Sequence, residues 1–511
     1  MKFKDIYHYF LPFSFFILLS FFLANYVGFD RHWSATYDHE LTLSYNALLF
    51  NNGIKMEYHE HPGYFTILFL SLFLKILSIL DFVTIDKLSL INKENFDQSF
   101  QEIITYTRVY SVFLVSIFSF LNYCLIYIFS KKKVFSFCLA LIISTSPGTI
   151  FHITQMRTEL MAMLLMLISL IFLKKFLENN KFRYIHLLGF FLFMFCALLN
   201  KMQVFFLYPF FLILFYSFEN KIDDFDTKNF EFLNYKWVPL ILFLILIFYI
   251  YLPNNTLHPF PFLSSFAIIF YIFIINLFFY LIMRGQNKNI KKNLVVINLS
   301  LIAVFFVTKN ILLLHPSTPE IIFIHLTRIM HQAQYISESP PVDDLYNMIS
   351  FLFVKFFIFS SAVFENIILK FNIYSVLIIL NILITLVYRK SMTRKMLFFN
   401  FLCVLISIFI IIINSYRSSG HLMPQYYIFS EIFLVLSFCN FFKLLKLHYV
   451  IIIFIISFLT NYETNLEILK NKKETENKNT IHSLCNGPYF YDWHKRIEKE
   501  YFLNFCKNKS T

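Results

Sequence analysis

Charged residues are scarce in this chain of 511 residues. Asp, Glu, Lys and Arg make up 15% of it and hydrophobic residues 58%, whereas soluble domains carry roughly a quarter charged residues. Glycine is also scarce, with 8 residues in all, and no glycine-rich phosphate loop or separate nucleotide-binding domain interrupts the apolar runs. These shortages exclude an ordinary soluble protein and a soluble nucleotide-binding enzyme, and they predict a polytopic membrane protein.

Cysteine and histidine do not occur at the spacing of a metal site. Five of the seven cysteines lie in apolar segments, where a thiol ordinarily serves as a small buried hydrophobe. Cys485 and Cys506 lie in the polar tail and either pair in a disulfide or remain free thiols. His59 and His61 have no third ligand beside them. We therefore assign no metal site and no certain cofactor, and a divalent metal stays an open alternative.

The formal net charge of +13 comes largely from Lys and Arg in short loops between apolar runs. In membrane proteins such loops face the cytoplasm, so this charge does not predict nucleic-acid binding. If every apolar run crossed the membrane, several basic loops would be exported. Interfacial helices at 64–82 and 348–366 keep those loops inside and predict an all-α fold with about thirteen transmembrane helices.

This map divides the chain into a transmembrane domain, 1–461, and a polar C-terminal tail, 462–511, on the outside. The apolar run at about 9–28 lacks a small-x-small cleavage site, so we expect an uncleaved first span with the amino terminus inside. The outer face then carries a first loop at 29–106 and a later loop at 315–370, both with interfacial helices. The inner face has short, mostly basic loops, so we expect any chemistry at the outer face.

The first outer loop concentrates ionisable groups directly after the first apolar run. Asp38 and Glu40 are followed by an apolar-faced helix over 45–50 and by Gly53, which is typical of a helix C-terminus. This helix would hold both carboxylates against the bilayer surface. Being two residues apart, the carboxylates reach one site together only from extended backbone. The alternative is a solvated acidic loop.

Two short outer turns carry further charges. Arg157 and Glu159 lie in the turn Gln155–Leu160, and Lys201 lies between two apolar helices. Charged residues at such positions either anchor the helix ends or line a functional cavity. An external Lys in so short a turn opposes the positive-inside tendency. Lys201 is therefore a candidate phosphate ligand, with a simple anchor as the alternative.

Two later outer segments carry basic and aromatic side chains. The segment "SYRSSGHLMPQYY" holds Arg417, His421 and Tyr426 at the entrance to the next predicted span, and Arg328 lies in a helical pattern over 324–335. Each is also compatible with a simple interfacial helix. Together with the first loop, these segments place carboxylates, a lysine and several arginines on one face of a membrane bundle.

The order of these segments resembles the GT-C superfamily of polytopic glycosyltransferases. That group includes the protein O-mannosyltransferases, the lipid A aminoarabinose transferases and the lipid-carrier-dependent glycosyltransferases of bacterial envelopes. The similarity covers most of residues 30–215 and then 415–435. It rests on the acidic first loop that ends in His-Pro-Gly, on "YTRVYSVFL" with Arg108, on "QMRTEL" and "LLNKMQ", and on the late arginine before "MPQYY".

The resemblance implies a catalytic base in the first outer loop, where the family often has an adjacent Asp-Glu pair. Here His39 interrupts that pair, so the base is Asp38 or Glu40, and we favour Asp38. Glu159 matches the family's second acid and Lys201 its outer-face lysine. The expected catalytic residues are Asp38, Glu40 and Glu159, and the expected substrate- and phosphate-binding residues are Lys201, Arg417, Arg157, Arg108, His61, His421, Tyr426 and Arg328.

The resemblance also implies a reaction and a location. The expected activity is inverting transfer of a sugar from a polyprenyl-phosphate donor to a glycolipid, lipopolysaccharide, glycan or protein acceptor. It would occur at the outer, periplasmic face of a bacterial cytoplasmic membrane, among membrane lipids. The alternatives are a transporter or flippase and a polysaccharide polymerase or ligase for lipid-linked glycans. Transporters place ionisable groups near the middle of the bilayer, whereas the predicted spans here are nearly free of charge, which favours an enzyme.

Overall fold

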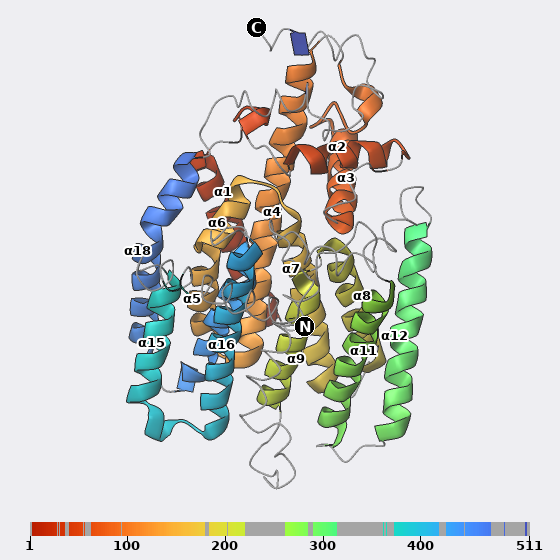
Figure 1. Cartoon of the computed structure of the whole chain (residues 1–511). Coiled ribbons are helices and arrows are strands. Elements are labelled where there is room, and N and C mark those ends of the chain that lie inside the picture. Colours follow the sequence, from red (N-terminus) through yellow and green to blue (C-terminus); the bar gives the residue numbers. More distant parts are fainter. Residues whose placement is uncertain are drawn as a thin grey trace, which may run out of the picture.

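The computed structural model describes the greater part of the chain. The described residues are 3–27, 29, 31–35, 40–54, 56, 63–92, 95–178, 183–201, 203–219, 261–284, 290–313, 361, 364, 373–417, 426–443, 445–471, 485 and 506–507. They form helices and turns, with no strand among them (Figure 1), which confirms the all-α fold class.

The first part of the chain supplies the centre of the helical bundle. The 35-residue helix α4 is its longest described element, and α1, α5 and α7 pack against it. The elements in this part are α1 (Phe3–Val27), η1 (Trp33–Ala35), α2 (Glu40–Asn51), α3 (Tyr64–Ile79), η2 (Leu88–Leu90), α4 (Phe96–Ser130), α5 (Lys133–Ser144), α6 (Pro147–Thr154), α7 (Thr158–Glu178), α8 (Arg183–Asn200) and α9 (Gln203–Glu219).

The later part of the chain adds helices around this centre (Figure 1). Among them, α17 packs against α16 and α5, and α18 packs against α5 and α6. The elements are α11 (Pro261–Arg284), α12 (Ile290–Leu313), α15 (Ile373–Val387), η8 (Arg389–Ser391), α16 (Arg394–Arg417), α17 (Ile428–Leu436), η10 (Ser437–Lys443) and α18 (Leu447–Asn471).

Several helices have the length and composition of membrane spans. In the described part of the chain, α1, α4, α7 and α16 contain segments that are long and apolar enough to cross a membrane, and the bent pair α5–α6 makes a fifth if it forms one span. In the other apolar helices the described apolar segments are shorter, with 10–17 residues. A membrane protein fits these findings, while the count of about thirteen spans stays a prediction. The apolar run at 237–252 lies outside the described residues, as does nearly all of the predicted interfacial helix at 348–366.

The two ends of the bundle differ in their turns. Lys131 ends α4 in the left-handed conformation, with φ 55°, and η8 carries Arg389 and Lys390 between α15 and α16. Figure 1 places both turns at the end of the bundle opposite α2 and α3. Basic turns at one end are what the positive-inside pattern predicts for the cytoplasmic face.

The predicted helix in the first outer loop is present and ends as its sequence predicts. It begins earlier than expected, at Glu40, and closes with Gly53 at φ 67°. The N–H of Gly53 donates to the carbonyl of Phe50 at 3.0 Å, and that of Ile54 donates to the carbonyl of Leu49 at 3.0 Å. This pair of bonds is a Schellman motif, in which glycine adopts the left-handed conformation without a Cβ clash.

A break divides α5 from α6. The two helices form an angle of 60°, and Pro147 stands at the start of α6, where its missing N–H costs no helical hydrogen bond. Ser146 caps α6 by accepting a hydrogen bond from the backbone of Thr149. The carbonyl of Thr145, beside the break, accepts from Nδ2 of Asn465 in α18 at 2.8 Å.

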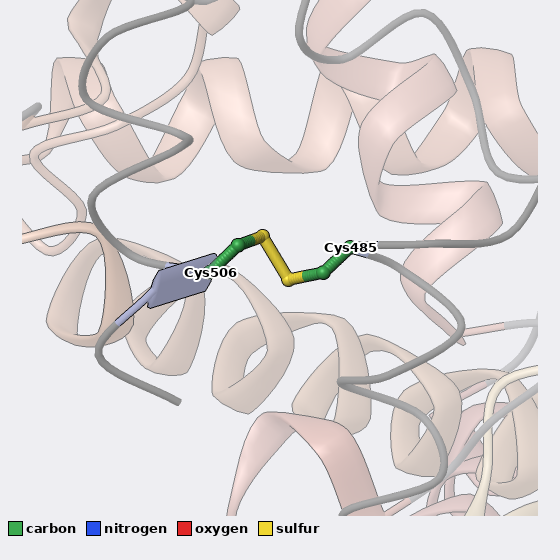
Figure 2. Close-up of a disulfide and its surroundings, with 2 residues drawn as sticks. All are labelled: Cys485 and Cys506. Carbon is green, nitrogen blue, oxygen red and sulfur yellow. A yellow bond between two sulfur atoms is a disulfide. The ribbon is translucent and has the colours of Figure 1, made fainter. Parts of the chain in front are cut away.

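Cys485 and Cys506 form a disulfide, which decides between the two alternatives left open by the sequence. Their Cα atoms are 5.6 Å apart and their sequence separation is 21. Figure 2 shows the bond, and the short dark-blue element that carries Cys506 lies near the C label in Figure 1, at the end of the bundle where α4 begins. Both cysteines pack against the main hydrophobic core. A disulfide of this kind persists in an oxidising compartment.

We expect the disulfide to form in the native protein and to contribute about 3 kcal/mol to the free energy of unfolding, because it closes a loop of about twenty residues. Peptide mapping by mass spectrometry without reduction should recover the linked pair. The double variant Cys485→Ser, Cys506→Ser should lower the unfolding temperature and lose its response to reductant. Recovery of both thiols in the free form would contradict this expectation.

The charge pattern predicts that Ser89 and Lys390 face opposite sides of the membrane. Both residues are exposed, so single cysteines at these positions should react freely with a maleimide that cannot cross membranes. In a background with the five free cysteines replaced by Ala, Ser89→Cys should react in intact cells and Lys390→Cys only after lysis. The opposite result at either position would refute this orientation.

Candidate functional site

The carboxylate of Glu40 is the centre of a buried ionic cluster. Glu40 lies in the first turn of α2 and is 0% exposed. Its Oε2 accepts from Nε of Arg108 at 3.2 Å, and its Oε1 accepts from the backbone N–H of Met156 at 3.2 Å. Arg108 belongs to α4 and Met156 to the turn after α6. One carboxylate therefore joins three segments that are far apart in the sequence.

Arg108 also binds the backbone that follows α1. Its Nη1 donates to the carbonyl oxygens of Phe29 at 3.1 Å and Arg31 at 2.5 Å, and its Nη2 donates to that of His32 at 3.3 Å. These carbonyls lie outside regular helical hydrogen bonding, so a buried guanidinium satisfies them in place of water. The chain after α1 is thereby held against α4.

Arg31 is a second guanidinium in this cluster. It donates from Nη2 to the carbonyl of Thr154, the last residue of α6. Burial, followed by repulsion from Arg108, lowers the pKa of Arg31 to about 10, and the charge of Glu40 opposes that shift. Because this pKa lies well above 7, Arg31 stays positively charged at neutral pH.

A second buried cluster surrounds Glu159. Its Oε1 lies 2.9 Å from Nζ of Lys201, and its Oε2 lies 3.3 Å from Nε of Arg157. The side chains of Glu159 and Lys201 are 0% exposed and that of Arg157 is 6% exposed. The guanidinium of Arg157 also lies 5.9 Å from the ring centroid of Phe151, a cation–π distance. One carboxylate is thus shared by two cations at the start of α7.

Asn200 ties the start of α3 to this second cluster. Its Oδ1 accepts from the backbone N–H of Thr66 at 2.9 Å, and its Nδ2 donates to the carbonyl of Thr158 at 2.7 Å. Gly63 makes the approach close, because a Cβ at that position would meet Cγ2 of Thr158 at 2.4 Å. The end of the first outer segment therefore packs against the start of α7.

The two clusters are joined through adjacent residues, since Met156 binds Glu40 and Arg157 binds Glu159. Burying a charge is costly unless it is paired. Among the described residues, cations nonetheless outnumber carboxylates here, a balance that favours an anionic ligand. The carboxylates are Glu40 and Glu159, and the cations are Arg31, Arg108, Arg157 and Lys201.

The predicted site residues fall into three groups. Glu40, Arg108, Arg157, Glu159 and Lys201 come together in the two linked clusters. Tyr426 is buried and stacks on Phe429, with ring centroids 6.4 Å apart, and Arg417 is the last residue of α16, where its side chain is not described. Four predicted residues, Asp38, His61, Arg328 and His421, lie outside the described residues, and their roles stay predictions.

Two residues of these clusters, Arg31 and Asn200, were not among the predicted site residues. Arg31 contacts Thr154, and its signal was a basic residue directly after the first apolar run. Asn200 precedes Lys201 at the end of an apolar helix. A polar side chain at a helix end often binds backbone groups that lack a partner within the helix. An arginine or an asparagine at such a position occurs both in buried contacts and in solvated turns. The sequence alone therefore does not predict these pairings.

The described residues contain no group of three or more His, Cys, Asp or Glu side chains arranged to hold a metal ion. His59 and His61 lie outside the described part of the chain. No family model, no curated protein and no solved structure matches this chain.

Removing one partner of the Glu159–Lys201 pair should strongly destabilise the protein. Glu159→Gln or Lys201→Met should each cost about 3–5 kcal/mol, because a buried charge loses its partner. The double variant should recover part of that loss in a thermal-unfolding double-mutant cycle. As a matched control, Glu178→Gln affects a carboxylate that is 44% exposed and should cost less than about 1 kcal/mol. Equal losses at both sites would contradict the assignment.

Proposed function

We propose that this protein is a membrane glycosyltransferase. It moves a sugar from a polyprenyl-phosphate carrier to a lipid, glycan or protein acceptor, with inversion at the anomeric carbon. The supporting observation is the convergence of Glu40, Glu159 and four cations at one end of an apolar bundle. The order of motifs that resembles the GT-C superfamily supports the same proposal.

The reaction requires a base beside the acceptor hydroxyl and positive charge beside the leaving phosphate. A carboxylate removes the proton of the acceptor hydroxyl, and that oxygen attacks the anomeric carbon. The bond from this carbon to the phosphate oxygen breaks, and the carrier phosphate leaves with the bonding electrons. General-base assistance contributes on the order of 10²–10⁴-fold, and fixed cations stabilise the charge that grows on the leaving phosphate.

The hydrogen bonds of each carboxylate support a different role for each in the proposed reaction. Both oxygens of Glu40 already accept hydrogen bonds, from Arg108 and from the backbone of Met156. With both oxygens already engaged, Glu40 suits a positioning role, and we propose Asp38 as the base. Glu159 holds Lys201 in place, and the described cations of the two clusters, which outnumber the described carboxylates, stabilise the negative charge of the carrier phosphate.

The outer face of the cytoplasmic membrane is the proposed location. Glu40 is the first residue of α2, and α2 lies at the end of the bundle away from the turn that joins α15 to α16 (Figure 1). The disulfide lies at the same end, and disulfides persist on the oxidising side of the membrane. A lipid-carried donor needs no soluble nucleotide-binding domain, in keeping with the composition.

A transporter or flippase for anionic, lipid-linked solutes is the second candidate. It is favoured by the 60° break between α5 and α6, because transporters often build their sites from discontinuous helices. Against it, Arg157 and Lys201 belong to the turns before α7 and after α8, at helix ends rather than in the middle of a helix. A polymerase or ligase for lipid-linked glycans would use the same carrier without requiring the acidic first loop.

Replacing Asp38 by Asn should lower sugar transfer by two or more orders of magnitude while carrier binding survives, because the amide keeps the shape and loses the basicity. The assay is transfer from a radiolabelled polyprenyl-phosphate sugar in membranes, alongside carrier binding. Asp81→Asn is the matched control, since Asp81 is exposed in the same outer segment. Near-normal transfer by the double variant Asp38→Asn, Glu40→Gln would rule out this loop as catalytic and revive the transporter.

A further inference from the structure

Three glutamates are buried in the described part of the chain, and their partners differ. Glu40 faces Arg108, and Glu159 faces Lys201 and Arg157. Glu431, in α17, is 3% exposed and has no ion pair with a described residue. An isolated carboxylate in apolar surroundings is strongly disfavoured, and such a group ordinarily binds a proton instead. The third glutamate therefore differs in kind from the two in the candidate site.

The carboxyl of Glu431 lies against the break between α5 and α6. Its Oε2 is 2.5 Å from Oγ of Ser146, and its Oε1 accepts from the backbone N–H of Gly148 at 3.2 Å. The hydroxyl of Tyr374, from α15, is 3.4 Å from Oε1. The close approach needs a glycine, because a Cβ on Gly148 would lie 2.7 Å from the backbone N of Ile428 and 2.9 Å from the carboxyl itself.

The hydrogen-bond donors and acceptors around Glu431 favour a neutral, protonated carboxyl. Ser146 has one hydroxyl proton, and its Oγ also lies 2.7 Å from the carbonyl of Ile143, which can only accept. If Ser146 donates to that carbonyl, the proton in the 2.5 Å contact must come from Glu431. The neutral acid then donates from Oε2 and accepts at Oε1, so every group has a partner. The ionised form would instead take the proton of Ser146 and leave a buried negative charge without a cation.

The other groups around Glu431 do not supply a positive charge. The phenol of Tyr374 faces it from α15, and the phenol of Tyr427 belongs to the residue just before α17. His152 lies one turn along α6 from Gly148, and no hydrogen bond or ion pair joins it to the carboxyl. Within the described residues, the contacts of Glu431 are therefore hydroxyls and one backbone N–H.

We propose that Glu431 forms a proton-binding site at the break between α5 and α6, occupied at neutral pH, with its acid proton donated to Ser146. The bound proton lets α17 pack against the start of α6. The other end of that helix, at Thr154, binds Arg31 of the Glu40 cluster. Protonation of Glu431 is thus linked through α6 to the geometry of the candidate site. The proposal does not rest on sugar transfer.

Infrared spectroscopy of the full-length protein in lipid nanodiscs tests the proton directly. At pH 7 the wild type should show the C=O stretch of a protonated carboxyl, and uniform ¹³C-labelling of glutamate should shift that band. The band should disappear in Glu431→Gln and persist in Glu178→Gln, a control whose carboxylate is 44% exposed and paired with Lys174. Absence of a glutamate acid band in the wild type, or its persistence in Glu431→Gln, would overturn the proposal.

A comparison of two variants provides an independent measurement. Glu431→Gln keeps a donor for Ser146 and an acceptor for Gly148 without a charge, so its unfolding temperature should match that of the wild type at pH 7. Glu431→Ala removes both and should unfold at a clearly lower temperature. If the native group were ionised, the glutamine would lack the charge that the site requires. Equal destabilisation by Gln and Ala would therefore refute a neutral Glu431.

Discussion

The pairing of buried charge is the constraint on which this structure depends. In a chain that is 58% hydrophobic, each buried ion that lacks a partner costs several kcal/mol. The protein meets this cost by bringing opposite charges from distant segments together, as in the contact between Glu40 and Arg108. The ion pairs thus position the irregular segments at one end of the bundle, where apolar packing alone is not specific.

The same constraint organises the backbone near these pairs. Arg108 satisfies three carbonyls after α1, Arg31 satisfies the last carbonyl of α6, and Asn200 joins the starts of α3 and α7. Helix ends leave carbonyl and N–H groups without partners, and few waters reach a buried site. Buried polar side chains therefore do what solvent does in an exposed loop. Among the described residues of the two clusters, cations outnumber carboxylates, which suits a phosphate.

Much of the fold follows from local sequence, and less of the site does. The helix from Glu40 to Asn51 ends at Gly53 because glycine there accepts a left-handed conformation. Basic turns at Lys131 and Arg389 were equally readable, since lysine and arginine collect on one side of a membrane. Each of these features depends on a few neighbouring residues.

The sequence by itself determined an all-helical, strongly apolar fold and which short turns carry charge, and it predicted a membrane protein, because these depend on composition and on the period of the chain. Only the tertiary structure decided which charges meet. Glu40 could have been a free acid in a solvated loop, but the fold places it against Arg108 and Met156. In the sequence Glu431 is the one acidic residue of the apolar segment 428–436, and the fold places Ser146 and Gly148 against it instead of a cation. These pairs join residues between 68 and 285 positions apart, and such pairing is set by helix packing, which no local pattern encodes.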